Sequence, residues 1–155
     1  GWVLSAHGKY KTLIKKLEVE DRVMISMRLS PKKKKKGIVE GLGGGPRLVK
    51  DGIINITGKE ERFQPDILYS RAPRTAIGIT PDNKLIMLVV DGRSKYSIGM
   101  TLWELADTMV RLGAVQAMNL DGGASSTLVI GDKIYNEPSA GERRIHNGLI
   151  IKLKE

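Results

Sequence analysis

The residues best suited to chemistry are concentrated in one short segment, residues 119–127. A carboxylate, Asp121, follows an apolar run there, and two glycines and three hydroxyl side chains come after it. This order places acceptors, donors and uncovered backbone N–H groups at one point, which is typical of a site for an oxygen-rich ligand. An Asp-Gly pair also forms ordinary turns in which the hydroxyls only satisfy the backbone, so the segment alone leaves both interpretations open.

A second carboxylate, Asp91, also follows an apolar run. If the runs before Asp91 and Asp121 are parallel strands of one sheet, both carboxylates lie at the same edge, where open sheets bind their ligands. Two carboxylates on either side of a glycosidic bond can divide the roles of acid and of base or nucleophile. A turn at the end of each strand explains the same two residues equally well.

Three arginines stand near the expected starts of strands: Arg74 and the pair Arg143-Arg144. A guanidinium binds phosphate oxygens through a planar fork, so these arginines are candidates for holding a phosphoryl group, although an exposed surface arginine is the commoner case. The two histidines, His7 and His146, have no second ligand at metal spacing, and the chain contains no cysteine. We therefore predict no metal site and no cofactor, and catalysis by a thiolate is excluded.

Other common chemistries lack their motifs. Ser125 and Ser126 are not surrounded by a nucleophile-elbow pattern, and the glycines at 41–45 match neither a P-loop nor a dinucleotide fingerprint. The net charge of +9 at pH 7 favours an anionic partner, and five of the positive charges form a block at 32–36. Because no aromatic residue lies near this block, it lacks the stacking platforms of single-strand binders, and we predict no nucleic-acid partner.

The spacing of apolar residues predicts the elements that must position these side chains. A capping pattern from Thr101 to Glu104 begins a helix over 101–112, and Gly113 ends it. The strand at 84–90, this helix and the strand at 114–120 suit a crossover unit. The other expected elements are a helix at 10–17, strands at 23–29 and 148–153, hairpins at 48–54, 75–90 and 128–135, a glycine loop at 41–46 and an irregular stretch at 63–71.

These elements predict an α+β fold, with a mixed sheet built from hairpins and one crossover helix at about 101–112. The chain has 155 residues, of which 41% are hydrophobic and 28% charged, the balance of a single globular domain over 1–155. The longest apolar run, at 85–90, is too short to span a membrane, so we predict no membrane span.

Taken in chain order, six segments resemble the phosphodiester glycosidase family. They are GGGPRLVKDG at 43–52, RTAIG at 74–78, VVDGR at 89–93, GMT at 99–101, NLDGGASST at 119–127 and RIHNG at 144–148. The resemblance extends over most of the chain, from residue 2 to residue 153. It implies hydrolysis of the anomeric C–O bond between a sugar and a phosphate, which releases the free sugar and a phosphomonoester.

The resemblance also implies roles for individual residues. Asp121 and Asp91 become the catalytic residues, and which of the two acts as acid, base or nucleophile stays open. The implied substrate-binding residues are Arg74, Thr75, Asn119, Gly122, Gly123, Ser126, Arg144 and Asn147. The implied partner is a sugar-phosphate or polysaccharide substrate in cell-wall or exopolysaccharide metabolism, and the implied location is extracytoplasmic.

The chain departs from the family pattern in one respect. Family members usually begin with an upstream segment that contains an Asn-Gly-x-Phe-Phe motif and contributes to the pocket, whereas the single phenylalanine here is Phe63. We therefore expect that residues 1–155 lack this N-terminal segment. Two alternatives to a glycosidase follow: a non-catalytic module that binds polysaccharide or phosphate on the same fold, and a nucleic-acid binder supported by charge alone.

Overall fold

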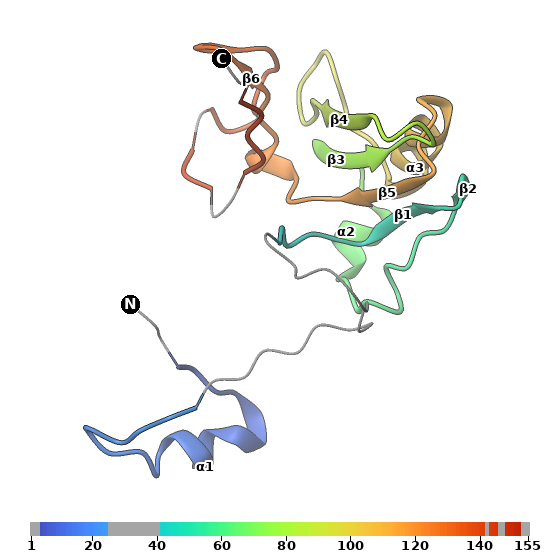
Figure 1. Cartoon of the computed structure of the whole chain (residues 1–155). Helices are drawn as coiled ribbons and strands as arrows, with labels where there is room; N and C mark the ends of the chain where they lie inside the picture. Colours follow the sequence, from blue (N-terminus) through green and yellow to red (C-terminus); the bar gives the residue numbers. More distant parts are fainter. Residues whose placement is uncertain (1–3, 25–40, 142, 146–147, 153–155) are drawn as a thin grey trace. The chain divides into compact units, whose positions relative to one another are not determined.

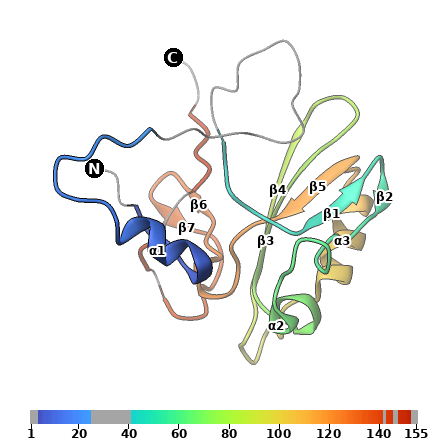
Figure 2. The same ribbon diagram turned by 90° about the horizontal axis from the view of Figure 1, so that it is seen from below.

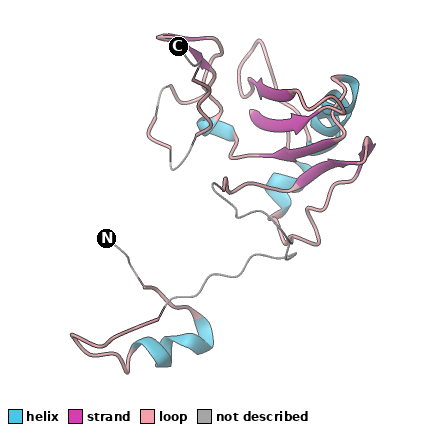
Figure 3. Cartoon of the chain, in the orientation of Figure 1, coloured by secondary structure: helices cyan, strands magenta, loops and turns pink. Residues whose placement is uncertain are grey.

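The computed structural model describes residues 4–24, 41–141, 143–145 and 148–152. The chain divides into two compact units, Gly1–Val39 and Glu40–Glu155 (Figure 1). Every strand found among the described residues belongs to the second unit, as the colouring by secondary structure shows (Figure 3).

The first unit contains one short helical segment. A 3-10 turn at Gly8–Tyr10 leads into helix α1, Lys11–Ile14, so the helix expected at 10–17 is confirmed in place but ends earlier. Leu13 and Leu17 of its apolar face are exposed, and an apolar stripe that is not packed adds little to the stability of a helix. Most of the strand expected at 23–29, and the lysine block at 32–36, lie outside the described residues.

The second unit is built around a five-stranded sheet in the order β2-β1-β5-β3-β4, in which all hydrogen-bonded neighbours are antiparallel (Figure 1). Its strands are β1 (Arg47–Lys50), β2 (Ile53–Ile54), β3 (Arg74–Ile79), β4 (Leu85–Val90) and β5 (Gln116–Asn119). Asp51 and Gly52 connect β1 to β2 at φ angles of 52° and 77°, which two-residue hairpin turns require. The hairpins expected at 48–54 and 75–90 are therefore confirmed.

Strands β4 and β5 run in the same direction, because each pairs antiparallel with β3 between them. Helix α3 (Leu102–Arg111) connects the two, which confirms the expected crossover unit and the α+β fold. Arg74 at the start of β3 lies opposite Val90, and Ala76 lies opposite Asn119. The carboxyl ends of β4 and β5 therefore meet the amino end of β3 at one edge of the sheet.

Helix α3 packs on one side of the sheet and forms the core with it (Figure 2). The expected capping box is present: the Thr101 hydroxyl accepts from the Glu104 backbone N–H, and the Glu104 carboxylate accepts from the Thr101 backbone N–H. A Cβ atom at Gly78 would lie 2.6 Å from Cε of Met109, so glycine at this position lets the helix approach β3 closely. The core residues are Leu48, Val49, Ala76, Leu102, Leu105, Ala106, Met109, Ala114 and Ala117.

The opposite face of β3 and β4 is apolar and partly open. Ile79, Leu85 and Met87 are each between 44% and 45% exposed, and Ile79 lies opposite Leu85 in the register. Within the described part of the second unit, helix α3 therefore covers one face of the sheet, while these side chains on the other face stay in contact with solvent.

The stretch at 63–71, expected to be irregular, contains a short helix, α2 (Pro65–Tyr69). Pro65 stands in the first turn, where its fixed φ angle suits a helix and its missing N–H costs nothing. Five residues are too few to show the 3.6-residue spacing of a helix, which is why the apolar pattern did not predict it.

The C-terminal region forms a small separate hairpin. Strands β6 (Val129–Ile130) and β7 (Lys133–Ile134) pair antiparallel across Gly131, which confirms the hairpin expected at 128–135. The strand expected at 148–153 is wrong for its described part, because residues 148–152 form no strand. Among the described residues, no helix has the length and apolar character needed to cross a bilayer.

Candidate active site

A cavity of about 570 Å³ opens at the sheet edge where β5 ends and β3 begins. The glycine loop before β1, helix α2, the start of β3 and the turn after β5 form its walls. Five of the expected site residues line it: Arg74, Asn119, Asp121, Gly122 and Gly123. The cavity therefore brings together segments that are more than 70 residues apart in the sequence, from Gly43 to Gly123.

Asp121 is exposed on the cavity wall, in a turn that is held tightly against the start of β3. The backbone N–H of Gly123 donates to the Pro73 carbonyl at 2.8 Å. A Cβ atom at Gly122 would lie 2.9 Å from that same carbonyl oxygen, so only glycine fits without a shift. The two glycines thus fix the position from which the Asp121 carboxylate reaches the cavity.

Asn119 links this turn to the glycine loop. The residue is 4% exposed, and its Nδ2 donates to the carbonyls of Gly45 and Leu120 at 2.7 and 2.8 Å. Its Oδ1 is buried and accepts no hydrogen bond from the described residues. Because a rotated amide would put Oδ1 against two carbonyl oxygens, the orientation is well defined, and the free acceptor sits in a residue of the cavity wall.

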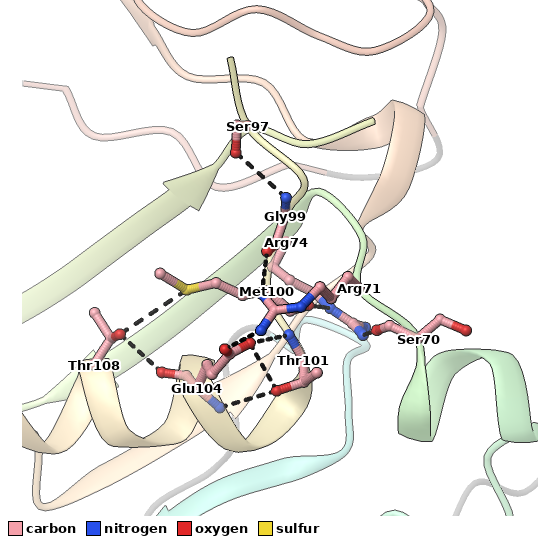
Figure 4. Close-up of polar contacts among 9 residues, drawn as sticks. All are labelled: Ser70, Arg71, Arg74, Ser97, Gly99, Met100, Thr101, Glu104 and Thr108. Carbon is pink, nitrogen blue, oxygen red and sulfur yellow. Dashed lines mark hydrogen bonds and ion pairs between the residues drawn. The ribbon is translucent and has the colours of Figure 1, made fainter. Parts of the chain in front are cut away.

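Arg74 is 4% exposed, and backbone carbonyls hold most of its guanidinium (Figure 4). Its Nε donates to Met100 at 2.9 Å, and its Nη2 donates to Ile67 at 3.0 Å and to Ser70 at 2.7 Å. These bonds tie α2 to the start of β3. Burial lowers the pKa of Arg74, the nearby charge of Arg93 lowers it further, and Asp66 opposes both effects.

Arg93 and Asp66 line the same cavity and were not among the expected site residues. The guanidinium of Arg93 lies over Gly123, since its Nη1 would be 3.5 Å from a Cβ atom there. Arg93 is exposed, and the ion pairs found among the described residues do not include it. Its guanidinium is therefore available to an anionic ligand.

The remaining expected residues lie outside the lining of this cavity. Asp91 Oδ1 accepts from Asn136 Nδ2 at 2.8 Å and from the Glu137 backbone N–H at 3.0 Å. The Thr75 hydroxyl donates to the hydroxyl of Ser126, which is 1% exposed, at 3.1 Å. These three residues join the sheet edge to the segment around β6 and β7.

Arg144 is exposed and does not line the cavity, and Asn147 lies outside the described residues. Within the part of the chain that the structure describes, no group of three or more His, Asp or Glu side chains is close enough together to hold a metal ion.

The sequence carried a signal for one of the two additional residues. Arg93 belongs to the VVDGR segment, but a loop residue after a strand has no periodicity to show which way its side chain points. Asp66 carried no signal, because helix α2, which places it, was not expected.

Comparison with known proteins gives one family. A model of the family described as phosphodiester glycosidase matches residues 5–152. The N-acetylglucosamine-1-phosphodiester alpha-N-acetylglucosaminidase of Bos taurus is 33% identical over 110 residues. That alignment covers 65% of this chain and 21% of the cattle enzyme, so the chain spans about a fifth of that relative.

Two solved structures share the fold. A hypothetical protein from Synechocystis aligns with a TM-score of 0.58 and 31% identity, over 64% of this chain and 18% of that one. The catalytic domain of zebrafish N-acetylglucosamine-1-phosphodiester alpha-N-acetylglucosaminidase, auto-inhibited by its pro-peptide, aligns with a TM-score of 0.57 and 30% identity. The second alignment covers 63% of this chain and 34% of the zebrafish chain.

Proposed function

The chain belongs to the phosphodiester glycosidase family, and we propose that it hydrolyses a sugar-1-phosphodiester at the anomeric C–O bond. The products are a free sugar and a phosphomonoester. N-acetylglucosamine is the proposed sugar, because the cattle and zebrafish relatives are named for it. The observation that carries the proposal is that Arg74, Arg93 and Asp121 line one cavity.

The two arginines suit the phosphate half of such a substrate. Arg93 offers a free guanidinium at the cavity wall, while Arg74 adds a fixed positive charge beside it. Guanidinium groups bind phosphate oxygens and neutralise the charge that grows on the phosphate as the C–O bond breaks. A phosphate stabilised in this way leaves as an anion, so its departure needs no protonated carboxylic acid.

Asp121 suits the sugar half. Its exposed carboxylate can assist attack at the anomeric carbon, either directly as a nucleophile or as a base toward water. Gly122 and Gly123 hold the turn in place, and the free acceptor of Asn119 stands in the same wall. Arg144 and Asn147 stay predicted substrate-binding residues.

We assign Asp91, the second carboxylate of the expected pair, to positioning. Its Oδ1 holds Asn136, whose amide also donates to the Ser126 carbonyl at 2.9 Å and accepts from the Leu128 backbone N–H at 2.7 Å. Together with the Thr75–Ser126 hydrogen bond, this network fixes the segment that follows the Asp121 turn.

We further propose that the enzyme works outside the cytoplasm, in cell-wall or exopolysaccharide metabolism. The resemblance to the family supports the location. The net charge of +9 supports a polyanionic substrate, such as a glycan linked through phosphodiesters, because excess positive charge raises the local concentration of anions.

The test is release of N-acetylglucosamine from an α-N-acetylglucosaminyl phosphodiester. It compares this chain, a longer chain that includes the family's upstream segment, and Asp121→Asn in both. We expect Asp121→Asn to lower kcat by about 100-fold or more. Asp82→Asn is the matched control, because Asp82 lies in the β3–β4 turn, is exposed and pairs with Lys84.

Turnover that survives Asp82→Asn and is lost in Asp121→Asn supports the proposal. If neither folded chain releases sugar from any diester, the glycosidase assignment is contradicted, and the binding-module alternative replaces it.

A further inference from the structure

We propose that a second cavity, between α2 and the start of α3, binds a neutral sugar ring. Its volume is about 400 Å³. This lies within the range of about 300 to 1,000 Å³ that is common for small-molecule sites. The lining residues that matter for its chemistry are Ile56, Lys59, Glu60, Leu68, Tyr69 and Trp103.

Two exposed aromatic side chains stand at this cavity. Tyr69 is 63% exposed and Trp103 is 60% exposed, although aromatic residues usually bury most of their large surface. Each also carries a polar group, a hydroxyl or an indole N–H, beside its apolar ring. Exposed aromatics that gather at a cavity are a mark of a binding site rather than of the core.

The floor and the rim of the cavity differ in character. Ile56 and Leu68 form an apolar floor that packs against the core. Lys59 and Glu60 are exposed at the rim, and neither takes part in the ion pairs found among the described residues. The rim therefore offers a donor and an acceptor that are free for a ligand.

A sugar ring matches this arrangement. Its C–H faces are apolar and stack on aromatic rings, while its hydroxyls reach out sideways to donors and acceptors. A purely apolar ligand would make no use of the donor and the acceptor that Lys59 and Glu60 offer at the rim. The floor, the aromatic walls and the charged rim thus select a neutral, hydroxyl-rich ring.

The walls of the cavity are held in place before a ligand arrives. Arg74 donates to the carbonyl of Ile67 in α2 and to that of Ser70 just after it. The Thr101 capping box fixes the start of α3 (Figure 4). Arg71 adds an ion pair to Glu104 and a hydrogen bond of 3.0 Å to the Gly99 carbonyl. A preorganised site loses less entropy on binding.

The choice of a sugar rests on the proposed function. Helix α2 separates the two cavities: Asp66 and Ile67 line the first, and Leu68 and Tyr69 line the second. A ring bound in the second cavity therefore lies beside the proposed phosphodiester site. The second cavity therefore suits a sugar residue of the glycan to which the phosphate is attached.

The test is a titration with two neutral trisaccharides, triacetylchitotriose (the trimer of N-acetylglucosamine) and mannotriose. The chain contains two tryptophans, so the fluorescence of a Trp2→Phe variant reports on Trp103 alone. We expect a saturable change in emission with at least one trisaccharide. In that background, Tyr69→Ala should weaken binding about tenfold.

Tyr96→Ala is the matched control, because Tyr96 is 77% exposed and lines neither cavity. Lys59→Ala gives a second test that leaves the aromatic residues intact, and it should also weaken binding. A circular dichroism melt checks the folding of each variant.

Several results would overturn the inference: no saturable change with either trisaccharide, equal effects of Tyr69→Ala and Tyr96→Ala, or binding of a proline-rich peptide in place of both sugars. Asp121→Asn separates the two proposals, because it should stop hydrolysis and leave the titration unchanged. Binding without any hydrolysis would contradict the proposed function alone, and hydrolysis without binding would contradict the second site alone.

Discussion

Arg74 and Arg93 line the same cavity but differ in the freedom of their guanidinium groups. Arg93 is exposed, so Arg93→Ala should raise KM about 10- to 100-fold and leave the melting temperature unchanged. Arg74→Ala removes the donor to the carbonyls of Ile67 and Ser70, whereas the Met100 carbonyl keeps the Ala72 N–H, and it should lower the free energy of unfolding by about 1 to 3 kcal/mol. Steady-state kinetics and thermal melts of both variants check this. Equal losses of stability would contradict it.

The role of Asp91 can be separated from that of Asp121 by a pair of substitutions. Asparagine keeps an oxygen that can accept from Asn136 and Glu137, whereas alanine does not. We expect Asp91→Asn to retain most activity, and Asp91→Ala to lose about 1 to 3 kcal/mol of stability. Steady-state kinetics and thermal melts of the two variants distinguish a positioning role of Asp91 from a catalytic one. A large fall in kcat for Asp91→Asn, without a change in stability, would instead make Asp91 a catalytic residue.

At the scale of elements, the start of α3 should respond to acid. The hydrogen bond from the Thr101 backbone lowers the pKa of Glu104, and the one from Arg71 lowers it further. A lowered carboxyl pKa stabilises the fold above the unfolded value of about 4.3, and this stabilisation is lost as the pH falls through the folded value. The stability difference between wild type and Glu104→Gln should therefore shrink below about pH 4.3. Melts from pH 7 to pH 3 measure it, and a constant difference would contradict the prediction.

The elements that the sequence predicted are those with local signals. The turn at Asp51-Gly52 and the cap at Thr101 specify a hairpin and a helix through their immediate neighbours. Helix α2 has no such pattern over its five residues. It is held by the packing of Leu68 against the core and by Arg74, which donates to the carbonyls of Ile67 and of Ser70 just after the helix. Only tertiary contacts reveal an element of this kind.

The same contrast, between local sequence signals and tertiary contacts, explains which features of the candidate site were predictable. Asp121, Gly122 and Gly123 were predictable because the turn after β5 concentrates polar groups in one segment. The division between Asp91, which is held by Asn136, and Asp121, which faces the cavity, depends on a residue 45 positions away from Asp91. Sequence spacing contains no information on that contact.

For the whole molecule, the two compact units predict separate stabilities. All residues of the core lie between Leu48 and Ala117, inside the unit Glu40–Glu155. We therefore expect a chain of residues 40–155 to unfold cooperatively at the same midpoint as the full chain. Calorimetry on both chains measures this. A lower midpoint, or no cooperative transition in the shorter chain, would show that residues 1–39 stabilise the fold.

Helix α2 is a wall shared by two cavities, and this has a thermodynamic consequence. Its position depends on the packing of Leu68 against the core and on the hydrogen bonds from the Arg74 guanidinium to the carbonyls of Ile67 and Ser70. A ligand that moves the helix while filling one cavity changes the volume that the other cavity offers. Coupling between two binding sites is reciprocal, so each ligand would then alter the affinity for the other by the same factor. Any coupling between the two cavities would therefore pass through a helix of five residues, Pro65–Tyr69.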